Sequence, residues 1–167
     1  VWAYTSSGGN LLDVMLGDKV RITVNNHLPE ATNMHWHGLD VPPAQDGHPH
    51  DVIAPNQSRV YEFTPPDAGT YWYHPHPHGR ASIQAARGLA APIVVRDPLD
   101  PIAALGITEH ILLFTTPQLD ESSQIAAYTM DEQMNGREGN LLLVNGQYQP
   151  VLTVPNGSTQ RLRLINA

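Results

Sequence analysis

Apolar and polar residues alternate most regularly in the first half of the chain. In KVRITVNN, the residues Val20, Ile22 and Val24 alternate with polar residues, which is the period of two typical of a strand with one buried face. Further extended runs are separated by clusters of Gly, Pro, Asn and Asp, and they are LLDVML, NMHWHG, RVYEFT, GTYWYH and LAAPIVVRD. Many short strands joined by polar turns predict an all-β fold, either a sandwich or a barrel.

The pattern changes after residue 97. One earlier segment, RASIQAARG, favours a short helix, and two Asp-Pro steps in RDPLDPIAALG then interrupt the strands. Apolar runs begin again in EHILLFTT, NLLLVNG and RLRLIN. We therefore expect one near-complete domain over residues 1–97 and the opening part of a second over residues 98–167. Because VWAY and TQRLRLINA have the character of strands without partners, we expect the chain to be part of a longer polypeptide.

Composition limits the classes of function. The 167 residues are 41% hydrophobic, which is enough for one core and part of a second. The net charge of −7 disfavours nucleic acid and anionic membranes as partners, because both would repel an acidic surface. No apolar stretch of about 20 residues is present to span a bilayer. The absence of cysteine excludes disulfides, thiolate catalysis and Cys-based metal sites, which leaves nine histidines as the unusual feature.

Four histidines form two closely spaced pairs. In HPHPHG, His74 and His76 each precede a proline, which holds both in extended conformation and projects their rings from the same side. In NMHWHG, His35 and His37 share one face of a strand while Trp36 points into a core. If the two strands are neighbours at about 4.8 Å, four imidazoles converge on one patch. A lone pair would be a weak signal, but two pairs predict a metal site of the kind that suits copper, zinc, iron or nickel.

The histidine pairs lie in a longer segment of recognisable character. This segment strongly resembles the first domain of three-domain multicopper oxidases, the family of laccases, bacterial copper efflux oxidases and spore-coat laccases. Its sequence is NMHWHGLDVPPAQDGHPHDVIAPNQSRVYEFTPPDAGTYWYHPHPHG. RASIQAARGLAAPIVVRD is most similar to the copper efflux branch, and LLVNGQYQPVLTVPNGSTQRLRLINA resembles the strands that open the second domain. The resemblance implies a cupredoxin-like Greek-key β-sandwich, followed by the incomplete start of a second cupredoxin-like domain.

The resemblance also implies a role for each of these histidines. His35 corresponds to the ligand of the type 2 copper, and His37 to a ligand of one type 3 copper. His74 corresponds to a second ligand of the copper that His37 binds, and His76 to a ligand of the other type 3 copper. His78 corresponds to no ligand and is expected to form structural hydrogen bonds near the site.

Asp46, in AQDGHPH, corresponds to a buried acid that assists proton delivery near the type 2 copper in related bacterial oxidases. The alternative is a turn-forming residue before Gly47, because Asp-Gly is a common turn pair. For His48 and His50, an accessory metal role and a plain loop role both stay open. We expect His27 and His110 to be packing or surface residues. The four methionines are too few and too scattered for a cuprous-ion patch.

The function implied by the resemblance is oxidation of a small reducing substrate, a phenol or a metal ion, coupled to four-electron reduction of dioxygen to water at a trinuclear copper cluster. The cluster takes eight histidines from the first and third domains, and this chain supplies four. The type 1 copper needs a cysteine, which this chain lacks. We therefore expect the chain to be inactive alone and to have the remaining domains of the same polypeptide as partners, in a periplasmic or secreted bacterial protein.

Two other classes of protein remain possible on the sequence. A short copper or zinc carrier could use the same four histidines without redox turnover, and a purely structural sandwich would retain no metal. Hydrolases are disfavoured, because the chain contains neither a Gly-x-Ser-x-Gly elbow nor a His-Glu-x-x-His motif.

Overall fold

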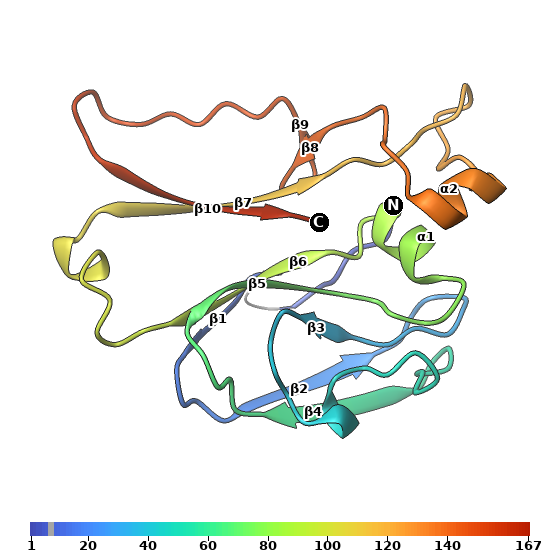
Figure 1. Ribbon diagram of the computed structural model, residues 1–167, viewed down its shortest axis with the longest axis horizontal. Helices are drawn as coiled ribbons and strands as arrows, with labels where there is room; N and C mark the ends of the chain where they lie inside the picture. The colour runs from blue at the N-terminus through green and yellow to red at the C-terminus, as the bar shows by residue number, and fades with distance from the viewer. Residues whose placement is uncertain (7–8) are drawn as a thin grey trace.

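The computed structural model describes residues 1–6 and 9–167 (Figure 1). The strands are β1 (Leu12–Met15), β2 (Val20–Asn25), β3 (His35–His37), β4 (Ser58–Phe63), β5 (Gly69–His74), β6 (Ala91–Arg96), β7 (Thr108–Thr115), β8 (Leu143–Val144), β9 (Gln147–Tyr148) and β10 (Gln160–Asn166). The helical segments are α1 (Ala81–Ala86), α2 (Met130–Asn135) and the 3-10 turns η1 (Pro43–Gln45) and η2 (Ala103–Leu105). The described chain is thus mostly β, as predicted, and α1 lies where a short helix was expected.

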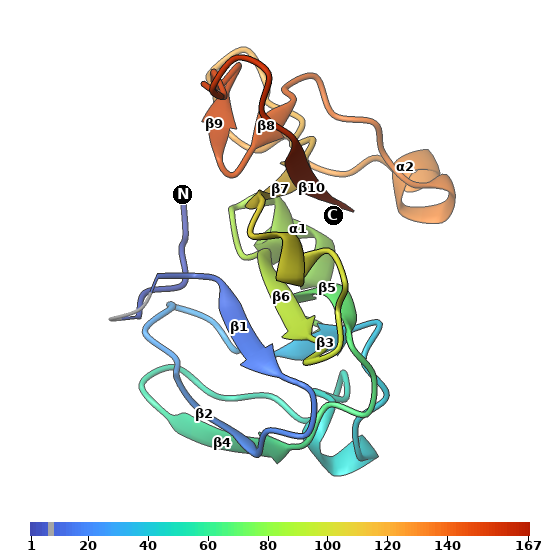
Figure 2. The same cartoon turned by 90° about the vertical axis from the view of Figure 1, so that its left-hand side faces the viewer.

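Two sheets enclose the core of the first half. One sheet has the strand order β1-β6-β5-β3, and the other contains the antiparallel pair β2 and β4 (Figure 2). Trp36 and Tyr61 are fully buried between them. Val20, Ile22 and Val24 of β2 pack against this core while their neighbours in the strand are exposed, as the alternation predicted. These sheets are consistent with a cupredoxin domain.

The second half builds a separate sheet. β10 pairs in parallel with β7 along the whole length of β10, β8 pairs with β7 in antiparallel orientation, and β9 pairs with β8. In Figure 1 this sheet lies beside β5 and β6. The division into residues 1–97 and 98–167 stays a prediction. Among the described residues, no helix is long and apolar enough to cross a membrane.

An ion-pair network joins the two halves. Glu109 of β7 contacts Arg96 of β6 at 2.9 Å and Arg163 of β10 at 2.7 Å. Arg161 lies 3.3 Å from the same carboxylate, and Arg163 also donates to the hydroxyl of Thr70 in β5 at 2.6 Å. The arginines lower the pKa of Glu109 although burial alone would raise it. This carboxylate therefore stays ionised between its cationic partners.

Candidate metal centre

Strand pairing brings the two histidine pairs together. β3 runs antiparallel to β5, with His35 opposite His74 and His37 opposite Trp72. The ring of His74 lies 5.3 Å from that of His35 and 5.4 Å from that of His37, measured between centroids. The ring of His76 lies 5.0 Å from that of His35. The strands that we expected to be neighbours are paired directly, and the four imidazoles occupy one patch.

The ring nitrogens of three of these histidines are close enough for metal binding. Those of His35, His37 and His74 all lie within 4.8 Å of one another. His37 Nδ1 and His74 Nε2 are 3.2 Å apart. Two imidazole nitrogens that share a tetrahedral metal at about 2.0–2.1 Å are separated by about 3.3 Å, so this pair fits a single ion. His76 is outside the group of three, and its ring lies on the side of His35.

Hydrogen bonds to backbone carbonyl groups indicate which nitrogen is free in the rings of His35 and His74. His74 Nδ1 lies 2.8 Å from the carbonyl oxygen of Pro75, so we assign its proton there and the free lone pair to Nε2. His35 Nδ1 lies 2.9 Å from the carbonyl oxygen of Asp46, which leaves Nε2 free in the same way. Metal-binding histidines usually donate their second N–H to such an oxygen. The donor set therefore fits a metal that accepts imidazole, and copper is one.

Burial favours the neutral form of three of these imidazoles, those of His37, His74 and His76. It is the main cause that lowers the pKa of His74 to about 4, and nearby histidines lower it further against the opposing effect of the Pro75 carbonyl. Burial also lowers the pKa of His37, with a smaller effect from His35. The pKa of His76 is lowered first by burial and then by His35. Neutral imidazole is the form that binds metals, so protons compete weakly for these rings near neutral pH.

Trp72 is a site residue that the sequence interpretation missed. Its indole stacks on His74, with centroids 4.2 Å apart, and on His37, with centroids 4.8 Å apart. The sequence did contain a sign of this role, because Trp72 and His74 are two residues apart in one strand and therefore share a face. Trp72 shields one side of both rings, whereas Trp36 points into the core as predicted.

Asp46 lies against His35. Its Oδ1 is 3.0 Å from His35 Nδ1, the nitrogen whose proton is directed at the Asp46 carbonyl oxygen. That Oδ1 is buried and accepts no aligned hydrogen bond. Asp46 also borders a cavity of about 130 Å³ whose lining includes His35, His76 and His48. The same residue follows η1 and precedes Gly47, which has a positive φ of 67°, so it also occupies a turn.

Buried Asn33 fixes the backbone around the site, and no pattern in the sequence indicated this role. Its Nδ2 donates to the carbonyl oxygens of Gly47 and His48, both at 3.0 Å. Its Oδ1 accepts from the backbone N–H of His76 at 2.6 Å. Gly47 packs so tightly that an added Cβ would lie 2.0 Å from the carbonyl oxygen of Met34. The loop that bears Asp46 is therefore held firmly against the start of β3.

The remaining histidines lie outside this centre. His27 is exposed, and His110 Nε2 contacts Gln160 Oε1 at 2.9 Å between β7 and β10, in keeping with surface and packing roles. His48, His50 and His78 gather at the surface.

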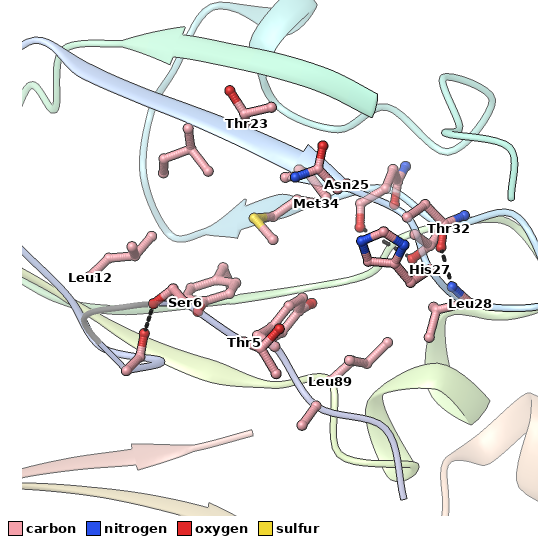
Figure 3. A pocket seen from close by; sticks show the side chains of 18 residues that line it. Thr5, Ser6, Leu12, Thr23, Asn25, His27, Leu28, Thr32, Met34 and Leu89 are labelled. Carbon is pink, nitrogen blue, oxygen red and sulfur yellow. Dashed lines mark hydrogen bonds between the residues drawn. The ribbon is translucent and has the colours of Figure 1, made fainter. Parts of the chain in front are cut away.

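A larger cavity of about 510 Å³ lies between β2 and the first residues of the chain, with Leu12, Thr32 and Leu89 in its lining (Figure 3). His27 is the one histidine among its described lining residues. This larger cavity is therefore separate from the candidate metal centre.

Comparison with known proteins places these residues in a family. A family model described as multicopper oxidase matches residues 5–100, which include all four paired histidines and Asp46. The multicopper oxidase mco of Staphylococcus aureus is 35% identical over 163 residues, which cover 95% of this chain and 36% of that protein.

Solved structures agree with this match. A multicopper oxidase of Campylobacter jejuni, described as a metallo-oxidase, has 46% identity and a TM-score of 0.75, with 83% of this chain and 29% of that one covered. A multi-copper oxidase of Pseudomonas thermotolerans has 34% identity and a TM-score of 0.87, with 99% of this chain and 41% of that one covered. This chain thus spans between about three tenths and two fifths of the length of these relatives. Since the family model covers more than half of the chain and the histidine cluster lies within it, the chain belongs to the multicopper oxidase family.

Proposed function

We propose that this chain supplies four of the histidine ligands of a trinuclear copper cluster that reduces dioxygen to water. In this proposal His35 binds the type 2 copper, His37 and His74 share one type 3 copper, and His76 binds the other. The observation that carries the proposal is that one ring nitrogen from each of His35, His37 and His74 lies within 4.8 Å of the others. Bound copper would supply the one-electron redox chemistry that the side chains themselves lack.

The protein's own groups orient and protect the ligands. The Pro75 carbonyl oxygen holds the Nδ1 proton of His74, and the Asp46 carbonyl oxygen holds that of His35, so each ring presents Nε2 to the site. The indole of Trp72 covers His37 and His74 and excludes water from that side. These contacts orient the rings of His35, His37 and His74 before a metal binds.

Asp46 is the proposed proton donor. Its buried Oδ1 lies 3.0 Å from His35 Nδ1, and its residue borders the cavity that also touches His76. A carboxyl group in this position can take a proton from water on the cavity side and release it next to the type 2 ligand. The side chain is about one third exposed, which keeps it accessible to proton exchange.

The whole-protein activity extends beyond this chain. We propose that the first 97 residues form a Greek-key cupredoxin-like domain and that residues 98–167 open a second one. The remaining domains of the same polypeptide would supply the other cluster ligands and a cysteine for the type 1 copper, which takes electrons from a phenol or a metal ion. Periplasmic or secreted localisation is part of the proposal.

The test uses the complete polypeptide that contains this chain. His35→Ala should lower the copper content and abolish oxygen uptake with a phenol donor, whereas the exposed His27→Ala serves as the matched control and should change neither. Full copper content and full oxygen uptake in His35→Ala would contradict the ligand assignment. Copper retention by the wild-type protein without any oxygen uptake would favour a metal carrier instead.

A further inference from the structure

A second group of histidines lies at the surface, outside the four proposed copper ligands. The rings of His50 and His78 have centroids 4.9 Å apart at an interplanar angle of 79°. The rings of His48 and His50 have centroids 5.6 Å apart. All three residues are exposed, so the group faces solvent with His50 in the middle.

The spacing suits imidazoles that share one ion. When each ring nitrogen lies about 2.0–2.1 Å from a metal, two ring centroids are about 5 Å apart, close to both separations in this group. His48 Nδ1 accepts a 3.4 Å hydrogen bond from the backbone N–H of His50, so its lone pair faces the His50 side. Among the described residues, the ring nitrogens of this surface group converge less tightly than those of His35, His37 and His74. Exposed side chains change rotamer within nanoseconds, so the rings can turn their nitrogens toward a shared ion.

The backbone beneath the group is firmly held. Buried Asn33 donates to the carbonyl oxygens of Gly47 and His48 and accepts from the backbone N–H of His76. One side chain thus ties together the two loop segments that bear the exposed histidines, although these segments are about thirty residues apart in the sequence. Because the backbone is already held, only the ring rotamers have to be ordered when an ion binds.

Neighbouring contacts stiffen the loop further. His48 precedes Pro49, which restricts it to extended conformation. The backbone N–H of Asp51 donates to the carbonyl oxygen of His48 at 2.9 Å, and the Asp51 carboxylate forms an ion pair with Arg59 of β4. The loop is therefore anchored on the sheet on one side and on Asn33 on the other.

We propose that His50 and His78, with His48 as the third ligand, bind one divalent copper ion at the surface. Imidazole suits Cu²⁺, and the Irving–Williams order ranks Cu²⁺ above Zn²⁺ at such a site. Water fills the remaining positions, because the group is open to solvent. This site is separate from the proposed cluster and does not depend on its function, although His48 also borders the cavity beside Asp46.

The experiment uses the complete, copper-loaded protein after desalting. Calorimetric titration with Cu²⁺, and separately with Zn²⁺, should reveal one additional ion per chain, bound more tightly for Cu²⁺. The Cu²⁺ added in this way should give an electron paramagnetic resonance signal with hyperfine splitting from two or three nitrogens. The double variant His50→Ala/His78→Ala should bind this ion at least tenfold more weakly, while His27→Ala, which removes an isolated exposed histidine, should bind it as the wild type does.

Three outcomes would overturn the proposal. They are the absence of an additional ion in the wild type, an unchanged affinity in the double variant, and an equal loss in His27→Ala. Failure of the cluster proposal is distinguishable, because it shows in the copper content after desalting and in oxygen uptake. Both of these should be the same in the double variant as in the wild type.

Discussion

The buried amide of Asn33 provides a sharp test of how the site is held. Asn33→Ala removes three hydrogen bonds, two to the carbonyl oxygens of Gly47 and His48 and one from the N–H of His76. At about 1 kcal/mol for each bond, the free energy of unfolding should fall by about 3 kcal/mol. The substitution also releases the segment of His76 and the loop of Asp46, so copper affinity should fall by about 10- to 100-fold.

Asn26 supplies a matched control. It is also buried, and it makes three hydrogen bonds, to the carbonyl oxygens of Glu30 and Ile53 and from the N–H of Leu28, at 2.9, 2.8 and 2.9 Å. Asn26→Ala should therefore cost a similar free energy of unfolding, about 3 kcal/mol, without touching the loops of the metal centre.

The assay compares two quantities in both variants. Urea denaturation of the metal-free protein gives the stability loss, and competition with a copper chelator gives the affinity. The expected result is an equal loss of stability in the two variants and a loss of copper affinity in Asn33→Ala alone. Equal copper affinities in the two variants would refute the idea that Asn33 positions the ligands.

Three further predictions follow from individual residues. The pKa of His74 is lowered from 6.5 to about 4 in the folded, metal-free protein, so the unfolded chain binds more protons between these two pH values. The free energy of unfolding should therefore fall by about 3 kcal/mol as the pH drops through this window. His74→Asn should lose that dependence in denaturation curves measured at several pH values. Gly47→Ala should destabilise the protein by several kcal/mol, because the added Cβ would meet the Met34 carbonyl oxygen. Gly79 has a φ of 70° and open space around it, so Gly79→Ala should cost only about 1–2 kcal/mol. Equal melting temperatures of the two variants would contradict this prediction. Asp46→Asn should keep its copper content and lose most of its oxygen uptake, and unchanged uptake would exclude a role in proton delivery.

The alternation of side chains predicted most of the first half. The strand at Val20–Asn25 and the shared face of His35 and His37 follow from the period of two, and the structure contains both. The prolines that follow His74 and His76 predicted an extended backbone at both histidines from the sequence alone. The strand and the shared face were predictable because they depend on residues close together in the sequence.

Contacts between residues far apart in the sequence could not be predicted from these local patterns. Alternation does not encode which strands are neighbours, so the parallel pairs β1 with β6 and β7 with β10 were not predicted. The hydrogen bonds of Asn33 reach residues 14, 15 and 43 positions away, and nothing in its neighbourhood marks it.

One local signal was overlooked. Thr129 and Glu132 form a capping box at the start of α2, and a Thr-x-x-Glu pattern is a known sign of a helix start.

The most direct test of the account is an anomalous difference map at the copper edge from crystals of the complete protein. We predict copper peaks about 2.0–2.1 Å from His35 Nε2 and from His74 Nε2, with His37 Nδ1 bound to the same ion as His74. A third peak should lie beside His76. A map from copper-loaded protein with no peak among these four rings would contradict the claim that this chain forms part of a copper cluster.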